Sequence, residues 1–250
     1  MRKLLLSCST FLGMCLVSLG VSAQEMPAGS VLVNTMCTIN DGYDFNDVLE
    51  AAREIDYDRE GGPDLMFFRR PIAANNAPPN AVLRVVYWQN LEHWATATFP
   101  SSRASQRLAD RLSCDNANRR FFQNRNVGGG NAYNGGENMR SLSAAVQCTI
   151  KDGRNIAEVY QGLMELNAPM KAQGDTSQMQ LSHRFLGPGQ SRGLGAAVTI
   201  RIVGQDPAGL AARLDMQARN TGVAPDAPVE NCSDFSLWES YVIYWGLPAQ

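Results

Sequence analysis

The chain has little of what metal sites and motif-based active sites are made from. Only two of its 250 residues are histidines, His93 and His183, and no C-x-x-C pair occurs, so no zinc-ligand spacing is present. The patterns G-x-S-x-G and H-E-x-x-H, the Walker loop and the Ca²⁺-binding loop are absent too. We therefore expect no metal and no cofactor, and the sequence assigns no catalytic residue.

Long apolar runs are equally scarce, because the sequence has only one, at its start. Two basic residues precede the uncharged segment 4–20, and residues 21–23, Val-Ser-Ala, end it with the small side chains that a signal peptidase reads. We expect residues 1–23 to be a signal peptide that is cleaved before Gln24. The protein is then secreted or periplasmic, and no later segment has the length and apolarity of a membrane span.

Two other roles for this segment are weaker alternatives. An uncleaved membrane anchor is one, although the apolar stretch is at the short edge of the about 20 residues that a span needs. A lipid anchor on Cys15 is the other, but bulky Met14 is a poor residue immediately before a lipidated cysteine. The Val-Ser-Ala end favours cleavage over both.

Positive charge is limited once the signal peptide is removed. Two bases and no acid leave with it, so 20 basic residues face 24 acidic ones, and lysine remains only at Lys151 and Lys171. This balance gives no electrostatic reason to expect nucleic acid as a partner. Arg103, Arg107 and Arg111 have the spacing of one helix face, which we interpret as water-facing, with a phosphate or carboxylate patch as the alternative.

Four cysteines stay in the mature chain, and they are Cys37, Cys114, Cys148 and Cys232. An even number in an oxidising compartment indicates structural disulfides. Four cysteines allow three pairings, and their spacing alone does not choose among them.

An internal repeat organises the chain. The hexapeptide Cys37-Thr-Ile-Asn-Asp-Gly42 recurs as Cys148-Thr-Ile-Lys-Asp-Gly153, and the apolar positions of the helix that follows recur at the same offset. A polar helix cap with an acid three residues later recurs as well. The two cap pairs are Asp44 with Asp47, and Asn155 with Glu158. We interpret the pattern as a duplication.

The duplication divides the chain into a first unit at 24–127, a Gly/Asn-rich linker at 128–140 and a second unit at 141–250. Each unit is predicted to run strand, helix, strand, strand, helix, strand. The expected elements of the first unit are 31–39, 46–55, 65–70, 82–88, 102–113 and 119–127. Those of the second are 146–150, 156–166, 179–185, 197–203, 208–219 and 237–245.

This βαββαβ order resembles the ferredoxin-like unit, and two such units resemble the dimeric α/β-barrel superfamily fused into one chain. The resemblance is one of topology and covers nearly the whole mature chain. It implies an α+β fold in which two four-stranded antiparallel sheets face each other and helices cover the outside, and it transfers no catalytic residue. The first and last strands of each unit are neighbours in that topology, which implies Cys37–Cys114 and Cys148–Cys232 disulfides.

Strand alternation, combined with this topology, predicts which side chains face the opposite sheet. Arg84 and Trp88 in the first unit and Arg201 in the second lie opposite the aliphatic residues that we assign to the helices. Thr38 and Thr149 are expected on the same inner face. Two arginines in a sheet-lined space can bind an acidic or polar small molecule.

Several alternatives to an open pocket follow from the same residues. Acids such as Glu239 can pair with the arginines across a filled interface. His183 is a candidate general base or haem ligand, with a hydrogen-bonded structural histidine as the alternative, and His93 is expected in a surface loop. The aromatic residues around Tyr241 favour core packing or a barrel wall over a carbohydrate platform.

Two functional hypotheses result. The first is an exported, non-enzymatic binding or envelope-associated module for a small polar or acidic ligand, based on the absence of any catalytic constellation. The second is a cofactor-independent enzyme, monooxygenase- or isomerase-like, of the kind found in the similar superfamily, with its site between the sheets. A deep apolar pocket containing His183 or a Glu239–Tyr241 pair favours the enzyme, and a filled barrel favours the module. The sequence decides neither enzymatic activity nor oligomeric state.

The signal peptide yields a direct prediction. Protein recovered from the secreted or periplasmic fraction should begin at Gln24, because residues 21–23 present the small side chains that the peptidase requires. Intact-mass analysis measures this. A retained N-terminus, or the mass of a lipid on Cys15, would contradict the prediction.

Overall fold

The computed structural model of the protein describes most of the chain after the expected signal peptide, which itself lies outside the described residues. The described ranges are 25–58, 61–74, 77–97, 101–130, 132–133, 140–188, 196–219 and 227–247. Within them, no helix is long and apolar enough to cross a membrane.

Strands and helices alternate along the chain much as predicted. The first half contains β1 (Ser30–Ile39), α1 (Phe45–Arg53), β2 (Leu65–Ala73), β3 (Ala81–Trp88), α2 (Leu91–Thr96), α3 (Arg103–Arg111), β4 (Leu112–Cys114), the 3₁₀ turn η1 (Asn116–Asn118) and β5 (Arg120–Asn126). The second half contains β6 (Arg140–Ile150), α4 (Ile156–Ala172), β7 (Gln178–Leu186), β8 (Ala197–Gly204), α5 (Pro207–Arg219), β9 (Val229–Glu230) and β10 (Ser236–Trp245).

Helix starts follow the predicted caps. The Asp44 side chain accepts backbone N–H groups at the start of α1, and Asp47 returns the bond, which completes a capping box. Asn155 and Glu158 do the same for α4, so both predicted caps are confirmed. The Asn90 side chain accepts the His93 N–H at 2.8 Å and starts α2, a helix that the sequence pattern missed.

Some boundaries differ from the prediction for physical reasons. The helix α4 runs to Ala172, beyond the predicted end at Leu166, although Pro169 lies inside it. A tertiary contact overrides this local stop signal, because Arg213 of α5 donates to the Asn167 side chain at 3.0 Å. The strand β6 begins at Arg140, six residues earlier than expected, because it continues its pairing with β10.

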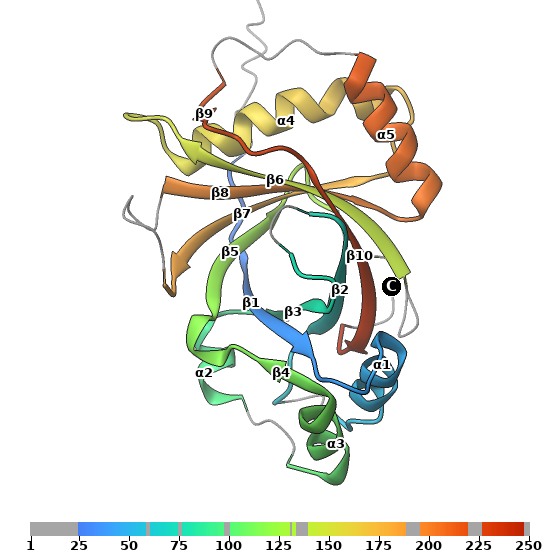
Figure 1. Cartoon of the computed structure of the whole chain (residues 1–250). Helices are drawn as coiled ribbons and strands as arrows, with labels where there is room; N and C mark the ends of the chain where they lie inside the picture. Colours follow the sequence, from blue (N-terminus) through green and yellow to red (C-terminus); the bar gives the residue numbers. More distant parts are fainter. Residues whose placement is uncertain are drawn as a thin grey trace, which may run out of the picture.

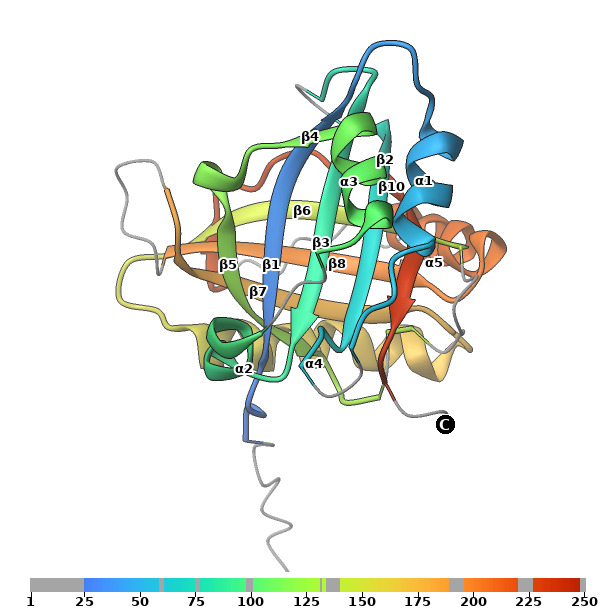
Figure 2. The same cartoon turned by 90° about the horizontal axis from the view of Figure 1, so that it is seen from below.

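Eight antiparallel strands close into a barrel. Their order is β10-β2-β3-β1-β5-β7-β8-β6, and β6 pairs with β10 to complete the circle. Figure 1 looks into this ring, with α4 and α5 over β6 and β8 on one side and α1 and α3 on the other. Figure 2 shows α1 and α3 lying across the outer face of the strands that include β2 and β3. A mixed α+β fold with a closed barrel is therefore confirmed.

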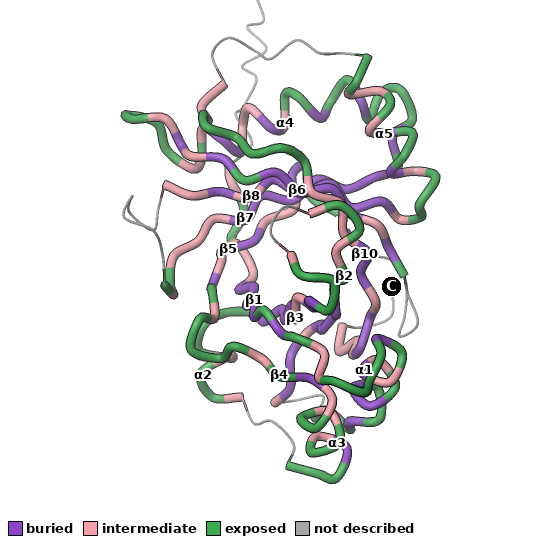
Figure 3. Tube along the Cα trace, viewed as in Figure 1, coloured by how far each residue is buried: buried purple, intermediate pink, exposed green. Residues whose placement is uncertain are grey.

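The apolar side chains form three clusters that follow this layering. One lies between α1, α3 and the strands they cover, a second lies between α4, α5 and theirs, and a third lies inside the barrel. Figure 3 shows the consequence, since buried positions follow the strands while the outward sides of the helices are exposed. Each strand is thus covered on both faces over much of its length.

Both disulfides have the predicted pairing. Cys37 of β1 is bonded to Cys114 of β4, its register partner, and Cys148 of β6 is bonded to Cys232. Each bond joins residues that are far apart in the sequence, with separations of 77 and 84 residues. The first and last parts of each half are therefore fixed to one another covalently.

Glu239 of β10 holds one closure of the barrel together from the outside. Its side chain is 2% exposed, forms an ion pair with Arg70 of β2 at 3.0 Å and a second ion pair with Arg140 of β6. The Tyr241 hydroxyl donates to the same carboxylate at 2.5 Å. One carboxylate thereby links three adjacent strands.

The disulfides lead to a stability prediction. Replacing Cys37 and Cys114 together by alanine should lower the free energy of unfolding by about 4 to 5 kcal/mol, because the bond closes a long loop in the unfolded chain. Urea unfolding under non-reducing conditions measures the change. The matched double variant at Cys148 and Cys232 should lose a similar amount, and losses below about 1 kcal/mol would contradict the loop-closure argument.

The Glu239 cluster leads to a pH prediction. Burial alone would raise the pKa of Glu239, but hydrogen bonds from Tyr241 and Arg140 and the charge of Arg140 outweigh it and lower the pKa. A lowered carboxyl pKa stabilises the fold above the unfolded-state pKa of about 4.3, and this stabilisation is lost as the pH falls through the lower folded-state value.

Glu239→Gln should therefore destabilise the protein by about 1 to 3 kcal/mol at pH 7, the range of hydrogen bonds to charged groups. The difference from the unsubstituted protein should narrow as the pH falls below about 4. Urea unfolding at a series of pH values measures both. A gap that is independent of pH would show that the carboxylate charge is not what stabilises the closure.

Candidate functional site

The interior of the barrel contains buried arginines that have no acidic partner among the described residues. At one part of it, apolar and aromatic side chains pack against one another, among them Leu32, Phe67, Val85 and Val203. Next to them the interior becomes polar, and two arginines, Arg69 and Arg201, lie there among hydroxyl and amide groups. We describe these arginines first because they define the chemistry of the space.

Arg69 is buried and partly satisfied. It is 1% exposed and lies on β2, in register with Ser240 of β10. Its Nε donates to Ser240 Oγ at 3.0 Å, its Nη2 donates to the Tyr133 hydroxyl at 2.6 Å, and the guanidinium lies 5.3 Å from the centre of the Phe67 ring. Its Nη1 is buried without an acceptor. One edge of the group thus remains available to a ligand.

Arg201 is buried and has no hydrogen-bond acceptor among the described residues. It is 5% exposed, lies on β8, and its Nη1 is shielded from solvent without a partner. Burial lowers its pKa to about 10, and the nearby charge of Arg69 acts in the same direction. A buried cation normally lies beside an acid, because an unpaired charge in the interior costs several kcal/mol. A bound anion would therefore supply the negative charge and the hydrogen-bond acceptor that Arg201 lacks in the described part of the chain.

No carboxylate on the barrel strands faces this interior. Among the eight strands as the structure describes them, Glu239 is the one acidic residue, and it faces outward with Arg70 and Tyr241. The inner surface instead carries neutral groups that bond to each other. The Tyr87 hydroxyl donates to Gln180 Oε1 at 3.3 Å, and Gln180 Nε2 donates to Asn126 Oδ1 at 3.0 Å.

A pocket of about 690 Å³ lies at the rim of the barrel, beside the Cys148–Cys232 disulfide. Arg120 of β5 and Arg184 of β7 line it, and no acid does so among the described residues. Burial lowers the pKa of Arg184, and the charge of Arg120 lowers it further. Thr199, another lining residue, precedes Arg201 by two positions on the same face of β8. The rim pocket and the buried Arg201 therefore lie along the same face of β8.

The inner-face prediction was correct in the second half and wrong for β3. Arg201 faces the interior as expected, and Thr149 lines the rim pocket. Arg84 and Trp88, however, face outward toward α2 and α3, where both line a small pocket of about 120 Å³ and Arg84 also lines a second one. Thr38 lies on the inner side of β1 but is exposed.

A slip of one residue explains the error at Arg84. Cys37 pairs with Val82, and the corresponding Cys148 pairs with Val198. By this register the counterpart of Arg201 is Val85, whereas Arg84 corresponds to Ile200. A shift by one position moves every side chain of a strand to the opposite face. Apart from Arg84, both faces of β3 are apolar and mostly buried, so its sequence carries no alternation that could have corrected the assignment.

The remaining candidates also lie outside the barrel. His183 shares the helix-covered face of β7 with Met179 and Leu181, and its Nδ1 is buried without a partner. Burial lowers its pKa, and the charge of Arg125 adds to this. His93 is half-buried in α2 rather than in a surface loop, and its ring meets Trp88 edge-on at 5.2 Å. Neither histidine reaches the interior arginines.

Two interior residues were missed by the sequence analysis. Strand alternation could have predicted an inward-facing arginine on β2, because Arg69 and Arg70 are adjacent and their side chains must point to opposite faces of the strand. Tyr133 could not be predicted in this way, because it belongs to segment 128–140, which was predicted as a Gly/Asn-rich linker between the units. Within that segment, Ala132 and Tyr133 are 1% and 3% exposed and lie in the apolar cluster inside the barrel.

Among the described residues, no three His, Cys, Asp or Glu side chains are grouped so that they could hold a metal ion. Burial raises the pKa of Tyr133, so its phenol stays neutral and can both donate and accept a hydrogen bond. The interior can therefore hold and orient an anion by guanidinium, phenol, hydroxyl and amide groups.

Comparison with known proteins finds only distant structural likenesses, and these assign no activity. No protein family and no curated protein matches the sequence. Among solved structures, a presumed monooxygenase from Fusobacterium nucleatum has 9% identity and a TM-score of 0.46, and the match covers 88% of this chain and 94% of that one. A chlorite dismutase from Candidatus Nitrospira defluvii has 9% identity and a TM-score of 0.46, covering 86% and 91%. These neighbours are dimeric α/β-barrel proteins, and likeness at this level gives no argument about ligand or chemistry.

Proposed function

We propose that the protein is an exported, non-enzymatic module that binds a small acidic molecule inside its barrel. The observation that carries the proposal is Arg201, a buried guanidinium for which the described residues supply no acceptor, close to a second buried guanidinium at Arg69. A chain selected only for stability would not retain this arrangement, because an apolar side chain of similar volume costs less in the same position.

The two guanidiniums define the class of ligand. Arginine presents its N–H donors in a fixed fork that matches carboxylate and phosphate oxygens. Two forks without a neighbouring acid favour a ligand with two negative charges, such as a phosphate or a dicarboxylate. Tyr133 and Ser240 already bond to Arg69 and would orient it toward the same ligand.

The rim pocket supports a route of entry. Arg120 and Arg184 lie in it without an acid among the described lining residues, so the field there attracts anions. The spacing of Thr199 and Arg201 on one face of β8 connects this rim to the interior. The mature chain is acidic overall, so local rather than net charge would guide the ligand.

The alternative is a cofactor-independent enzyme, monooxygenase- or isomerase-like, that uses the same interior. Such an enzyme needs a group that can accept a proton. The described inward-facing strand residues include no histidine and no carboxylate, and the Tyr133 pKa is raised rather than lowered. His183 and the Glu239–Tyr241 pair, which would have favoured an enzyme, lie on outer faces. These observations support binding over proton abstraction.

We also propose that the two halves are copies of one unit, at 24–127 and 141–250, and that residues 1–23 direct export. Support comes from the repeated hexapeptide, the equivalent caps and the equivalent disulfides. The strand orders β5-β1-β3-β2 and β10-β6-β8-β7 also correspond. Disulfides persist in oxidising compartments, which fits secretion or the periplasm.

The binding proposal predicts opposite effects of one substitution on stability and on affinity. Arg201→Met should raise the free energy of unfolding of the ligand-free protein by up to about 3 kcal/mol, because it removes an unpaired buried charge at similar volume. The same change should weaken binding of inorganic phosphate or succinate at least about tenfold, which corresponds to about 1.4 kcal/mol. Urea unfolding and isothermal titration calorimetry measure the two quantities.

Arg103→Gln is the matched control, because Arg103 is exposed on α3 and its removal changes the net charge equally. It should leave affinity unchanged. If Arg201→Met destabilises the protein and neither anion shifts the melting temperature of the unsubstituted chain, the arginine is structural and the barrel is a packed scaffold.

A further inference from the structure

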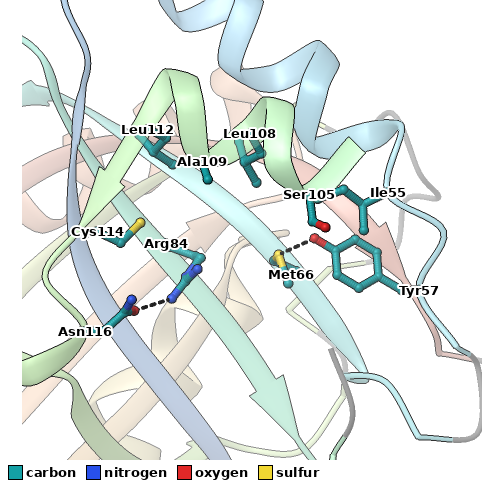
Figure 4. Close-up of a pocket in the computed structure, with 10 residues that line it drawn as sticks. All are labelled: Ile55, Tyr57, Met66, Arg84, Ser105, Leu108, Ala109, Leu112, Cys114 and Asn116. Atoms are coloured by element: carbon teal, nitrogen blue, oxygen red, sulfur yellow. Dashed lines mark hydrogen bonds between the residues drawn. The ribbon is translucent and has the colours of Figure 1, made fainter. Parts of the chain in front are cut away.

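A second pocket lies outside the barrel, between α3 and the sheet. Its volume is about 380 Å³, within the range of small-molecule pockets. We call it the α3 pocket and define it by Ile55, Tyr57, Met66, Arg84, Leu108 and Asn116. Figure 4 shows these side chains, contributed by α3, β2, β3 and the segments next to α1 and β4, arranged around the space.

The pocket exists because α3 does not press down onto the sheet. Ala104, Ser105 and Ala109 have short side chains, and the last two line the pocket. The helix is held instead from the side by α1, since Arg107 forms an ion pair with Glu54 and Arg111 donates to the Asp47 carbonyl at 2.8 Å. A helix that is fixed laterally and carries small inner residues leaves a space that its own side chains cannot fill.

The polar end of the pocket carries uncompensated positive charge. Arg84 Nη2 donates to Asn116 Oδ1 at 3.0 Å, and Arg119 Nε donates to the same oxygen at 3.3 Å. No acid lines the pocket among the described residues. Burial lowers the pKa of Arg84, and the charge of Arg119 adds to this. One neutral amide oxygen is thus shared by two cations, which an anionic oxygen would satisfy better.

A hydroxyl with a weak partner points into the same space. The Tyr57 O–H donates to Met66 Sδ at 3.6 Å, and a thioether is a poor acceptor. Burial raises the pKa of Tyr57 to about 12, against the opposing charge of Arg84, so the phenol is a neutral donor at ordinary pH. Ile55, beside the Tyr57 ring, and Leu108 of α3 add apolar side chains to the lining (Figure 4).

We propose that the α3 pocket binds an amphipathic monoanion, a molecule with one carboxylate and an apolar body such as a medium-chain fatty acid. The carboxylate would bond to Arg84 and replace the sulfur as the acceptor of the Tyr57 hydroxyl. The chain would lie against Ile55 and Leu108. This site is separate from the barrel interior, whose ligand is small, polar and doubly charged.

Decanoate is the probe, and 1-decanol is its uncharged match. Decanoate should bind saturably in isothermal titration calorimetry, and 1-decanol should bind at least about tenfold more weakly because it cannot use the charge of Arg84. Arg84→Gln should weaken decanoate binding by a similar factor, and Arg84→Lys, which keeps charge without the fork, should give an intermediate value. Ala109→Leu should abolish binding by filling the space from the helix side.

Controls separate this site from the barrel. Arg103→Gln, an exposed change on the same helix, should leave decanoate affinity unchanged, and saturating inorganic phosphate should not displace decanoate. Circular dichroism of each variant establishes that it is folded. Equal binding of decanol and decanoate, or full affinity in Arg84→Gln, would overturn the proposal, as would displacement of decanoate by phosphate.

Discussion

The barrel depends on two strand pairings that join the halves of the chain, β10 with β2 and β5 with β7. Through them every barrel strand has a hydrogen-bonded neighbour on both sides, so no long edge is left open to another chain. Closure also creates an inside, because alternate side chains must then point into an enclosed space. The helices can only cover the outside, and the positions that face inward are decided by register.

Buried arginines have different partners outside and inside the barrel. Arg213, between α4 and α5, is fully buried and pairs with Asp175 at 2.6 Å, with Asn167 as a second acceptor. That arrangement pairs the charge of a structural arginine with an acid, although its Nε and Nη2 are buried without a hydrogen-bond partner among the described residues. Arg201 is buried almost as deeply but pairs with no acid in the described part of the chain, where Arg69 bonds to neutral hydroxyls. The contrast within one molecule is the reason to read the interior pair as a binding feature.

Much of the fold could be predicted because its signals are local or repeated. The caps at Asp44 and Asn155 followed from short motifs, the pairing of Cys37 with Cys114 was implied by the resemblance in topology, and the structure confirms both. The candidate site was harder to predict, because it depends on which side chains of each strand point into the barrel. Apart from Arg84, the strand β3 is apolar on both faces, so Arg84 was assigned to the wrong face. Nothing in the glycine-rich segment indicated that Tyr133 would lie inside the barrel.

Tyr133 has a consequence for how tightly any ligand can bind. Its hydroxyl accepts a hydrogen bond from Arg69, so it occupies a position that a ligand oxygen would take. Because Tyr133 is already held inside the fold, its hydrogen bond forms without the loss of translational and rotational freedom that a dissolved ligand gives up. Under the proposed function, an anion would bond to the remaining Nη1 edge of Arg69 and share the guanidinium with Tyr133, or it would displace the phenol. Tyr133 would then compete with the ligand for one edge of Arg69.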